Sequence, residues 1–120
     1  MKYADTPMRF LSGTPSIPSL YAATEGAKII SSIGVKAIRE KSRRQTAMII
    51  DRASEYGFGI VSPLNPDLRG GTVTIAVPHA YEVSRELLQR EIIVDYREGA
   101  GIRLAPHFYN SDKEILYALG

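Results

Sequence analysis

One arginine of this sequence, Arg103, stands where a charged side chain is unusual, in the middle of a short apolar run. It lies between Ile102 and Leu104, in a stretch whose composition predicts a strand. Because successive side chains of a strand point to opposite faces, Arg103 is expected on the face opposite both neighbours. A guanidinium placed there can pair with a carboxylate through two parallel charged hydrogen bonds. Two interpretations remain open: Arg103 binds the carboxylate of a ligand, or it forms a structural salt bridge or faces solvent.

Other polar residues in the chain have simpler structural interpretations. Asn110 precedes the last predicted helix and is expected to cap it, and His107 is expected to pack against or bond its neighbours. His79 is interpreted as a turn residue at the end of a strand. The pair Gly70–Gly71 is expected to form a turn before a strand, although such glycines can also approach a phosphate. No residue of this group is assigned a catalytic role.

The composition excludes several classes of function. The chain has no cysteine and two histidines, which excludes disulfides, thiolate catalysis and histidine-rich metal sites. It contains no Walker loop, no G-x-G-x-x-G and no G-x-S-x-G motif. With 15 basic and 13 acidic residues, its formal net charge of +2 gives no argument for nucleic acid, and the basic run at 39–45 is interpreted as a solvated helix face. No apolar run is long enough to span a bilayer, so we expect a cytoplasmic protein that binds neither nucleic acid nor membrane.

The elements that would position Arg103 are predicted from apolar periodicity and from glycine and proline breaks. Two helices are predicted in the first half, one from Ser16, which is expected to cap it, to Gly34, and one from Val35 to Tyr56. The second half mixes short strands with helices: strands at 58–61, 72–77, 92–96 and 102–105, and helices at 80–90 and from 112 onward.

This order of elements predicts an α+β fold, with a small mixed or antiparallel sheet of about four strands and helices packed on one face. Residues 1–15 contain Pro7, Gly13 and Pro15 and lack periodicity, so they are expected to form a leading segment. Residues 16–120 are expected to form one small domain, since a chain of 120 residues suffices for a single core.

Two stretches of the sequence resemble segments of a known enzyme family. Residues 10–18, Phe-Leu-Ser-Gly-Thr-Pro-Ser-Ile-Pro, resemble the segment that opens the small-domain half of kynureninases. Residues 94–110, which run from Val-Asp-Tyr-Arg to His-Phe-Tyr-Asn, resemble their C-terminal signature. Residues 34–39 and 69–73 match similar stretches, and the resemblance covers residues 9–119. The Gly-Thr-Pro motif at 13–15 and the stretch 103–110 are shared with the wider class V aminotransferase group, which includes cysteine desulfurases.

The resemblance implies a hydrolase dependent on pyridoxal phosphate that cleaves the β–γ carbon bond of an amino acid. In such enzymes an arginine at the position of Arg103 binds the substrate α-carboxylate, which favours the carboxylate interpretation. A threonine at the position of Thr14 contacts the cofactor phosphate of the neighbouring subunit in a dimer, and Gly13 keeps the approach open. The cofactor lysine and the aspartate beside the pyridine nitrogen lie in a large domain upstream, and none of the five lysines here lies in that motif.

We therefore expect the C-terminal portion of such an enzyme, inactive alone, whose partner is a missing large domain or a separate large subunit. A truncation, a split gene product and a remnant of an enzyme would all give this chain. One alternative is a free-standing non-catalytic module that binds a partner or a small carboxylate and self-associates through uncovered apolar surface. Another is a different class V activity, an aminotransferase or a desulfurase; the absence of cysteine disfavours a desulfurase that carries its cysteine in this portion.

Overall fold

The structure, a computed structural model, describes residues 3–11 and 13–120. The chain divides into two compact units, Met1–Val35 and Lys36–Gly120. Residues 1, 2 and 12 belong to the predicted leading segment and lie outside the described residues. The split into a leading segment at 1–15 and a small domain at 16–120 stays a prediction.

The first unit consists of a short 3-10 helix, η1 (Pro7–Phe10), and the long helix α1 (Ile17–Ile33). Gly34 ends α1 as predicted: its φ is +87°, and its amide donates to the Ile30 carbonyl at 2.9 Å. The prediction that Ser16 caps the amides of the first turn is wrong, because its hydroxyl bonds the hydroxyl of Ser19 at 2.9 Å instead. No described side chain of α1 is buried, so this unit has no core of its own.

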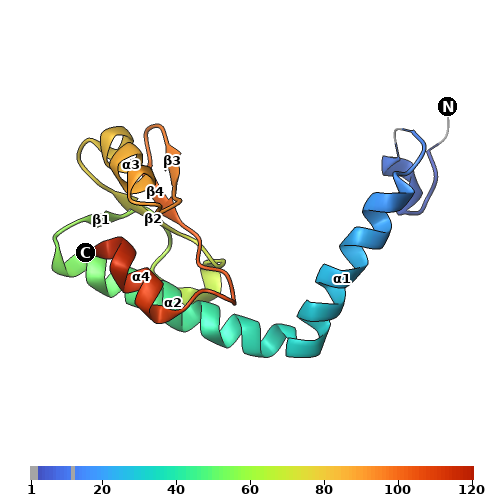
Figure 1. Ribbon diagram of the computed structural model, residues 1–120, viewed down its shortest axis with the longest axis horizontal. Helices are drawn as coiled ribbons and strands as arrows, with labels where there is room; N and C mark the ends of the chain where they lie inside the picture. The colour runs from blue at the N-terminus through green and yellow to red at the C-terminus, as the bar shows by residue number, and fades with distance from the viewer. Residues whose placement is uncertain (1–2, 12) are drawn as a thin grey trace. The chain divides into compact units, whose positions relative to one another are not determined.

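The helices α2 (Val35–Glu55) and α4 (Asp112–Leu119) lie side by side in the second unit and form one wall of its core (Figure 1). The positions that α2 buries recur at helical spacing: Gln45, Thr46, Ile49 and Ala53. Ile115 of α4 joins Ile49 and Ala53 in the same apolar cluster. Gly57, at φ +75°, follows the end of α2, as the sequence predicts.

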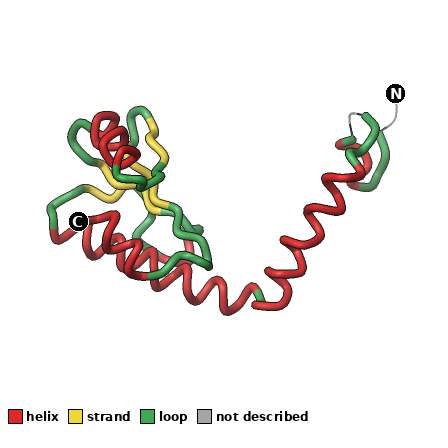
Figure 2. Tube along the Cα trace, in the orientation of Figure 1, coloured by secondary structure: helices red, strands yellow, loops and turns green. Residues whose placement is uncertain are grey.

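A four-stranded antiparallel sheet forms the other wall; its short strands are yellow in Figure 2. Its strands are β1 (Gly59–Ile60), β2 (Val73–Ala76), β3 (Asp95–Arg97) and β4 (Gly101–Leu104), in the spatial order β1-β2-β4-β3. The antiparallel pairing decides between the mixed and the antiparallel sheet that the sequence allowed, and the α+β class is confirmed.

The register assigns the two faces of this sheet. Val73 pairs with Leu104, and Ile75 pairs with Ile102, so the side chains of these four residues share one face. That face covers Ile49 of α2, and Val73, Ile75 and Ile102 are almost completely buried. The core therefore lies between this sheet face and the helices.

The helix α3 (Ala80–Gln89) covers the same face at its β3 end. Tyr81 at the start of α3 meets Tyr96 of β3 edge to face, with 5.5 Å between ring centroids. Tyr96 pairs with Ile102, whose side chain points to the core, so α3 lies on the core side of the sheet. For the helices of the second unit, the prediction that the helices pack on one face is confirmed.

The third strand differs from the prediction, which placed it at residues 92–96. The observed β3 begins at Asp95, because pairing with β4 starts there, at Arg103. Ile92 instead closes the end of α3, where its amide donates to the Leu87 carbonyl at 2.9 Å. The apolar run 92–94 therefore forms no strand. It lines a cavity together with Tyr117 and Ala118 of α4.

Candidate functional site

Arg103 lies on the sheet face opposite the one that packs against α2, α3 and α4. Arg103 pairs with Thr74 of β2 on one side and with Asp95 of β3 on the other, so these three side chains form a row across the sheet. Arg97 lies two residues beyond Asp95 and therefore shares its face. The sequence predicted that Arg103 points away from Ile102 and Leu104, and the register agrees.

Asp95 is the acidic centre of this row. Its Oδ2 accepts a hydrogen bond from Arg97 Nε at 2.8 Å and also lies 2.6 Å from Arg103 Nη2. The contact with Arg103 is an ion pair, whereas the contact with Arg97 is both an ion pair and a hydrogen bond. We name Asp95, Arg97 and Arg103 the sheet-face cluster.

Arg103 keeps hydrogen-bonding capacity beyond this ion pair. Its side chain is 39% exposed, yet its Nε is buried and has no hydrogen-bond partner. Because Nε has no exposed surface, an incoming ligand would approach the exposed part of the guanidinium. A carboxylate suits the geometry, because its two oxygens match two adjacent N–H groups of a guanidinium. The structural salt bridge that the sequence allowed is present, and the ligand-binding role of Arg103 stays a prediction.

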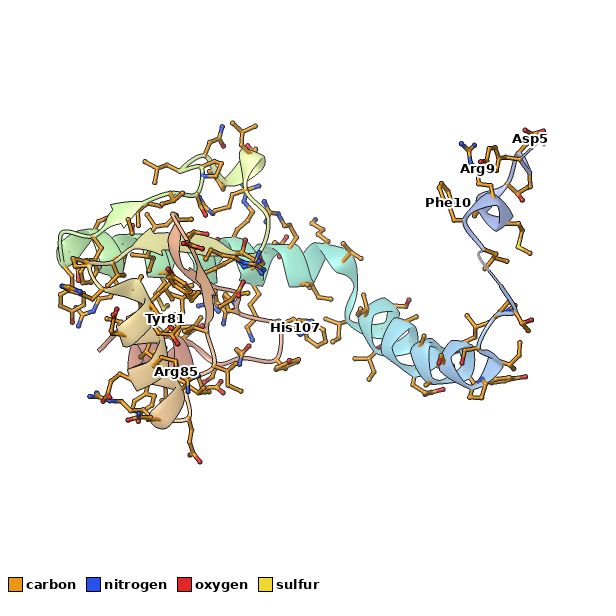
Figure 3. All side chains as sticks on the ribbon, turned by 90° about the horizontal axis from the view of Figure 1, so that it is seen from above. Asp5, Arg9, Phe10, Tyr81, Arg85 and His107 are labelled. Atoms are coloured by element: carbon orange, nitrogen blue, oxygen red, sulfur yellow. The ribbon has the colours of Figure 1, made fainter. Side chains whose placement is uncertain are left out.

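The loop between β4 and α4 is fixed to α2 by polar side chains. Lys41 Nζ donates to the Phe108 carbonyl at 2.7 Å, and Gln45 Nε2 donates to the Asn110 carbonyl at 3.0 Å. The ring of His107, on the same loop (Figure 3), lies 4.4 Å from the rings of both Phe108 and Tyr109. His107 is thus packed against its neighbours, as the sequence indicated, and the segment that follows Arg103 is held in place.

The prediction that Asn110 caps the last helix is wrong. Its side-chain oxygen accepts from the His107 amide at 2.8 Å and closes the loop on itself. Ser111 caps α4 instead, through a capping box in which its hydroxyl accepts from the Glu114 amide and Glu114 accepts from the Ser111 amide. Asn110 and Ser111 are both residue types that cap helices well, and the contacts of the loop with α2 decide between them.

Charges at the start of α4 strengthen its attachment to α2. Asp112 accepts hydrogen bonds from Arg44 and from Gln45, and these bonds lower the pKa of Asp112. The same pairing raises the pKa of Arg44. The hydrogen bonds of the capping box lower the pKa of Glu114. Carboxylates at a helix N-terminus are also stabilised by the helix dipole.

Another functional candidate that sequence reasoning missed is Arg69, which is buried. It lies beyond the 3-10 helix η2 (Pro66–Leu68), is 7% exposed, and donates from Nη1 to the carbonyls of Pro63 at 2.6 Å and Leu64 at 2.9 Å. Arg39 of α2 donates in turn to the carbonyls of Pro66 and Arg69. These guanidiniums hold the loop that leads into β2. In place of the predicted turn at Gly70–Gly71, the chain has a bend at Gly71.

Gly13 and Thr14, the predicted cofactor-binding residues, belong to the first unit. Both are exposed and precede α1, and a Cβ added to Gly13 would meet no atom within 4 Å. The Thr14 hydroxyl is therefore open to a phosphate from outside the chain. Their role stays a prediction, and no contact described in this chain engages them for another purpose.

Among residues 3–11 and 13–120, no group of three or more His, Asp or Glu side chains could hold a metal ion. None of the helices in the described part of the chain combines the length and the apolar character needed to cross a membrane.

Comparisons with known proteins agree on one family. The family model "Kynureninase C-terminal domain" matches residues 38–119. The chain is 34% identical over 117 residues to the uncharacterized aminotransferase YcbU of Bacillus subtilis (strain 168), a match that covers 98% of this chain and 31% of that protein. It is 30% identical over 117 residues to the kynureninase of Bacillus anthracis, with 93% and 27% covered.

Solved structures give the same fold. The apo cysteine desulfurase from Thermococcus onnurineus NA1 superposes with a TM-score of 0.85 at 25% identity, covering 99% of this chain and 33% of that one. A NifS-like protein superposes with a TM-score of 0.76 at 20% identity, which supports the fold alone. The chain thus spans about a third of the length of the relatives it matches. It belongs to the kynureninase C-terminal domain family, within the class V aminotransferase fold.

Proposed function

We propose that this chain is the small domain of a pyridoxal-phosphate-dependent, kynureninase-like hydrolase, and that Arg103 binds the α-carboxylate of its amino-acid substrate. The observation that carries the proposal is the partly exposed guanidinium of Arg103, on the sheet face opposite α2, α3 and α4. A large domain would cover this face, so that the substrate is enclosed between the two. The share of the relatives' length that this chain spans is what such a domain division would give.

The residues present fit pyridoxal phosphate only in part. Thr14 and the open backbone at Gly13 suit the cofactor phosphate of a neighbouring subunit in a homodimer. Two of the lysine amines are engaged within the chain, Lys28 with Glu25 at 2.7 Å and Lys41 with the Phe108 carbonyl at 2.7 Å. The lysine that holds the cofactor, and with it the electron sink that this cofactor supplies, would come from the large domain. We therefore expect no activity from this chain alone.

Nuclear magnetic resonance of the arginine side chains tests the role of Arg103 in the chain itself. Sodium acetate replaces sodium chloride at constant ionic strength, while the Nε–Hε signals are followed. We expect a saturable shift of the Arg103 signal. The signal of Arg90, which is paired with Glu86 on α3, should stay unchanged and serves as internal reference. An Arg103 signal that moves no more than that of Arg90 would refute carboxylate binding.

The enzymatic part of the proposal needs the large domain. A large-domain protein encoded next to this chain would be purified together with it, and cofactor uptake would be read from the absorbance of the internal imine. We expect the pair to take up pyridoxal phosphate and to cleave the β–γ carbon bond of an amino acid. Replacing Arg103 with Lys should then raise KM far more than it lowers kcat, because Lys cannot offer the bidentate fork. An unchanged KM would contradict the assignment.

A second candidate function is a different class V activity. It is favoured by the structural match to a cysteine desulfurase, which superposes with a TM-score of 0.85 at 25% identity. Assaying the same purified pair for sulfide release from cysteine and for amino-group transfer separates this candidate from hydrolysis. Sulfide release without carbon–carbon cleavage would replace the hydrolase proposal.

A further inference from the structure

We propose that Arg97 is a positioning residue of the carboxylate site: it engages Asp95, so that the sheet-face cluster keeps one net positive charge and Arg103 remains attractive to an incoming carboxylate. This inference rests on the proposed role of Arg103. Two guanidiniums and one carboxylate meet in the cluster. Without Arg97, Arg103 and Asp95 would form a neutral pair, and a ligand carboxylate would gain little by approaching it.

The register brings the three groups together. Asp95 pairs directly with Arg103 across β3 and β4, and Arg97 lies on the same face two residues further along β3. Both guanidiniums reach the same oxygen of Asp95, Oδ2. Among the described residues, no other acidic side chain pairs with either arginine.

Asp95 is shared between the two arginines. Its Oδ2 accepts a hydrogen bond from Arg97 Nε at 2.8 Å and lies 2.6 Å from Arg103 Nη2. Arg103 is the less exposed of the two, at 39% against 57% for Arg97. Because one carboxylate charge is divided between two guanidiniums, Asp95 does not fully neutralise Arg103, which can still attract a ligand carboxylate.

The test is the acetate titration of the full chain, applied to a set of variants. Replacing Arg97 with Gln should raise the acetate dissociation constant at Arg103 about three- to fivefold, since a charge contact between partly exposed groups is screened by water. Replacing Arg97 with Lys keeps the charge and should change the constant by less than about twofold. The double variant R97Q/D95N restores one net positive charge and should recover most of the lost affinity.

The matched control is Arg90→Gln, which also removes an arginine paired with a carboxylate at 2.7 Å, but on α3. It corrects for the loss of overall net charge. If Arg97→Gln weakens binding no more than Arg90→Gln does, or if the double variant fails to recover, the inference is overturned. Thermal unfolding of each variant shows whether it is folded, and a purely structural role for Arg97 would lower the melting temperature without moving the titration.

Failure of this inference is distinguishable from failure of the proposed function. If the Arg103 signal of the wild-type chain shifts saturably with acetate while Arg97→Gln leaves the dissociation constant unchanged, Arg103 binds carboxylate and only the role of Arg97 is lost. If the wild-type chain shows no response at Arg103, the proposed function fails first and this inference fails with it.

Discussion

Gly101, at the start of β4, allows the close approach of β4 to β2 on which the position of Arg103 depends. Its φ is +115°, where a residue with a side chain is strained, and an added Cβ would lie 2.1 Å from the carbonyl oxygen of Ile75. The obstacle is backbone of a buried strand, so no side-chain rotation can relieve it. We predict that Gly101→Ala costs about 2–5 kcal/mol of unfolding free energy, from backbone strain and overpacking together.

Urea unfolding followed by far-ultraviolet circular dichroism measures this loss, since the chain has no tryptophan for fluorescence. With a slope of about 1–2 kcal/mol per molar urea, the midpoint should fall by at least about 1 M. Gly99→Ala is the matched control, because Gly99 also has a positive φ, +74°, but an added Cβ there meets nothing within 4 Å. It should cost about 1–2 kcal/mol, for backbone strain alone. Equal losses in the two variants would refute the argument from the close approach of Gly101 to Ile75.

Three further predictions concern the side chains that fix the loop before β2 and the start of α4. Arg69→Met keeps the apolar bulk but removes the donors to two loop carbonyls and should cost about 2–4 kcal/mol in urea unfolding, whereas Arg43→Met, at an exposed ion pair, should cost less than about 1 kcal/mol. Ser111→Ala removes the cap of α4 and should cost about 1 kcal/mol by the same measurement; no loss would show that the capping box is dispensable. Asp112 has a lowered pKa when folded, so its stabilising contribution is complete above its unfolded pKa and is lost as the pH falls through the folded one, below about pH 4. In Asp112→Asn the melting temperature should therefore fall less steeply on acidification than in the wild-type chain, and parallel curves would contradict this assignment.

The helices were predictable because their signals are local. Apolar residues at helical spacing gave α1 and α2 within a residue or two of the observed bounds, and Gly34 and Gly57 ended them in the conformation expected of glycine. The prediction that Ser16 caps α1 was wrong for an equally local reason. Ser16 has a second hydroxyl within reach, that of Ser19, and bonds it in preference to the backbone.

Strand bounds depend on pairing, which a single segment does not encode. The run at 92–94 has the composition of a strand, but β4 offers it no partner, and the ladder begins only at Asp95. The choice between Asn110 and Ser111 as helix cap was likewise made by a distant residue, since Gln45 on α2 binds the Asn110 carbonyl. Burial of Arg69 has the same origin, because its acceptors are carbonyls of a loop whose course α2 determines through Arg39.

The candidate site depends both on local sequence patterns and on pairing between distant strands. Alternation along a strand was enough to place Arg103 on the face away from the core, because it needs only the two neighbouring residues. Its partner was not predictable in that way. Asp95 lies eight positions upstream and meets Arg103 only because the turn at 98–100 sets this register, and a shift of one residue would move Asp95 to the other face. The positive φ of Gly99 and Gly101 maintains that register, so these glycines influence the charge around Arg103 without contacting a ligand. The carboxylate affinity of Arg103 should accordingly be sensitive to the backbone of the β3–β4 turn as well as to the charges of the sheet-face cluster.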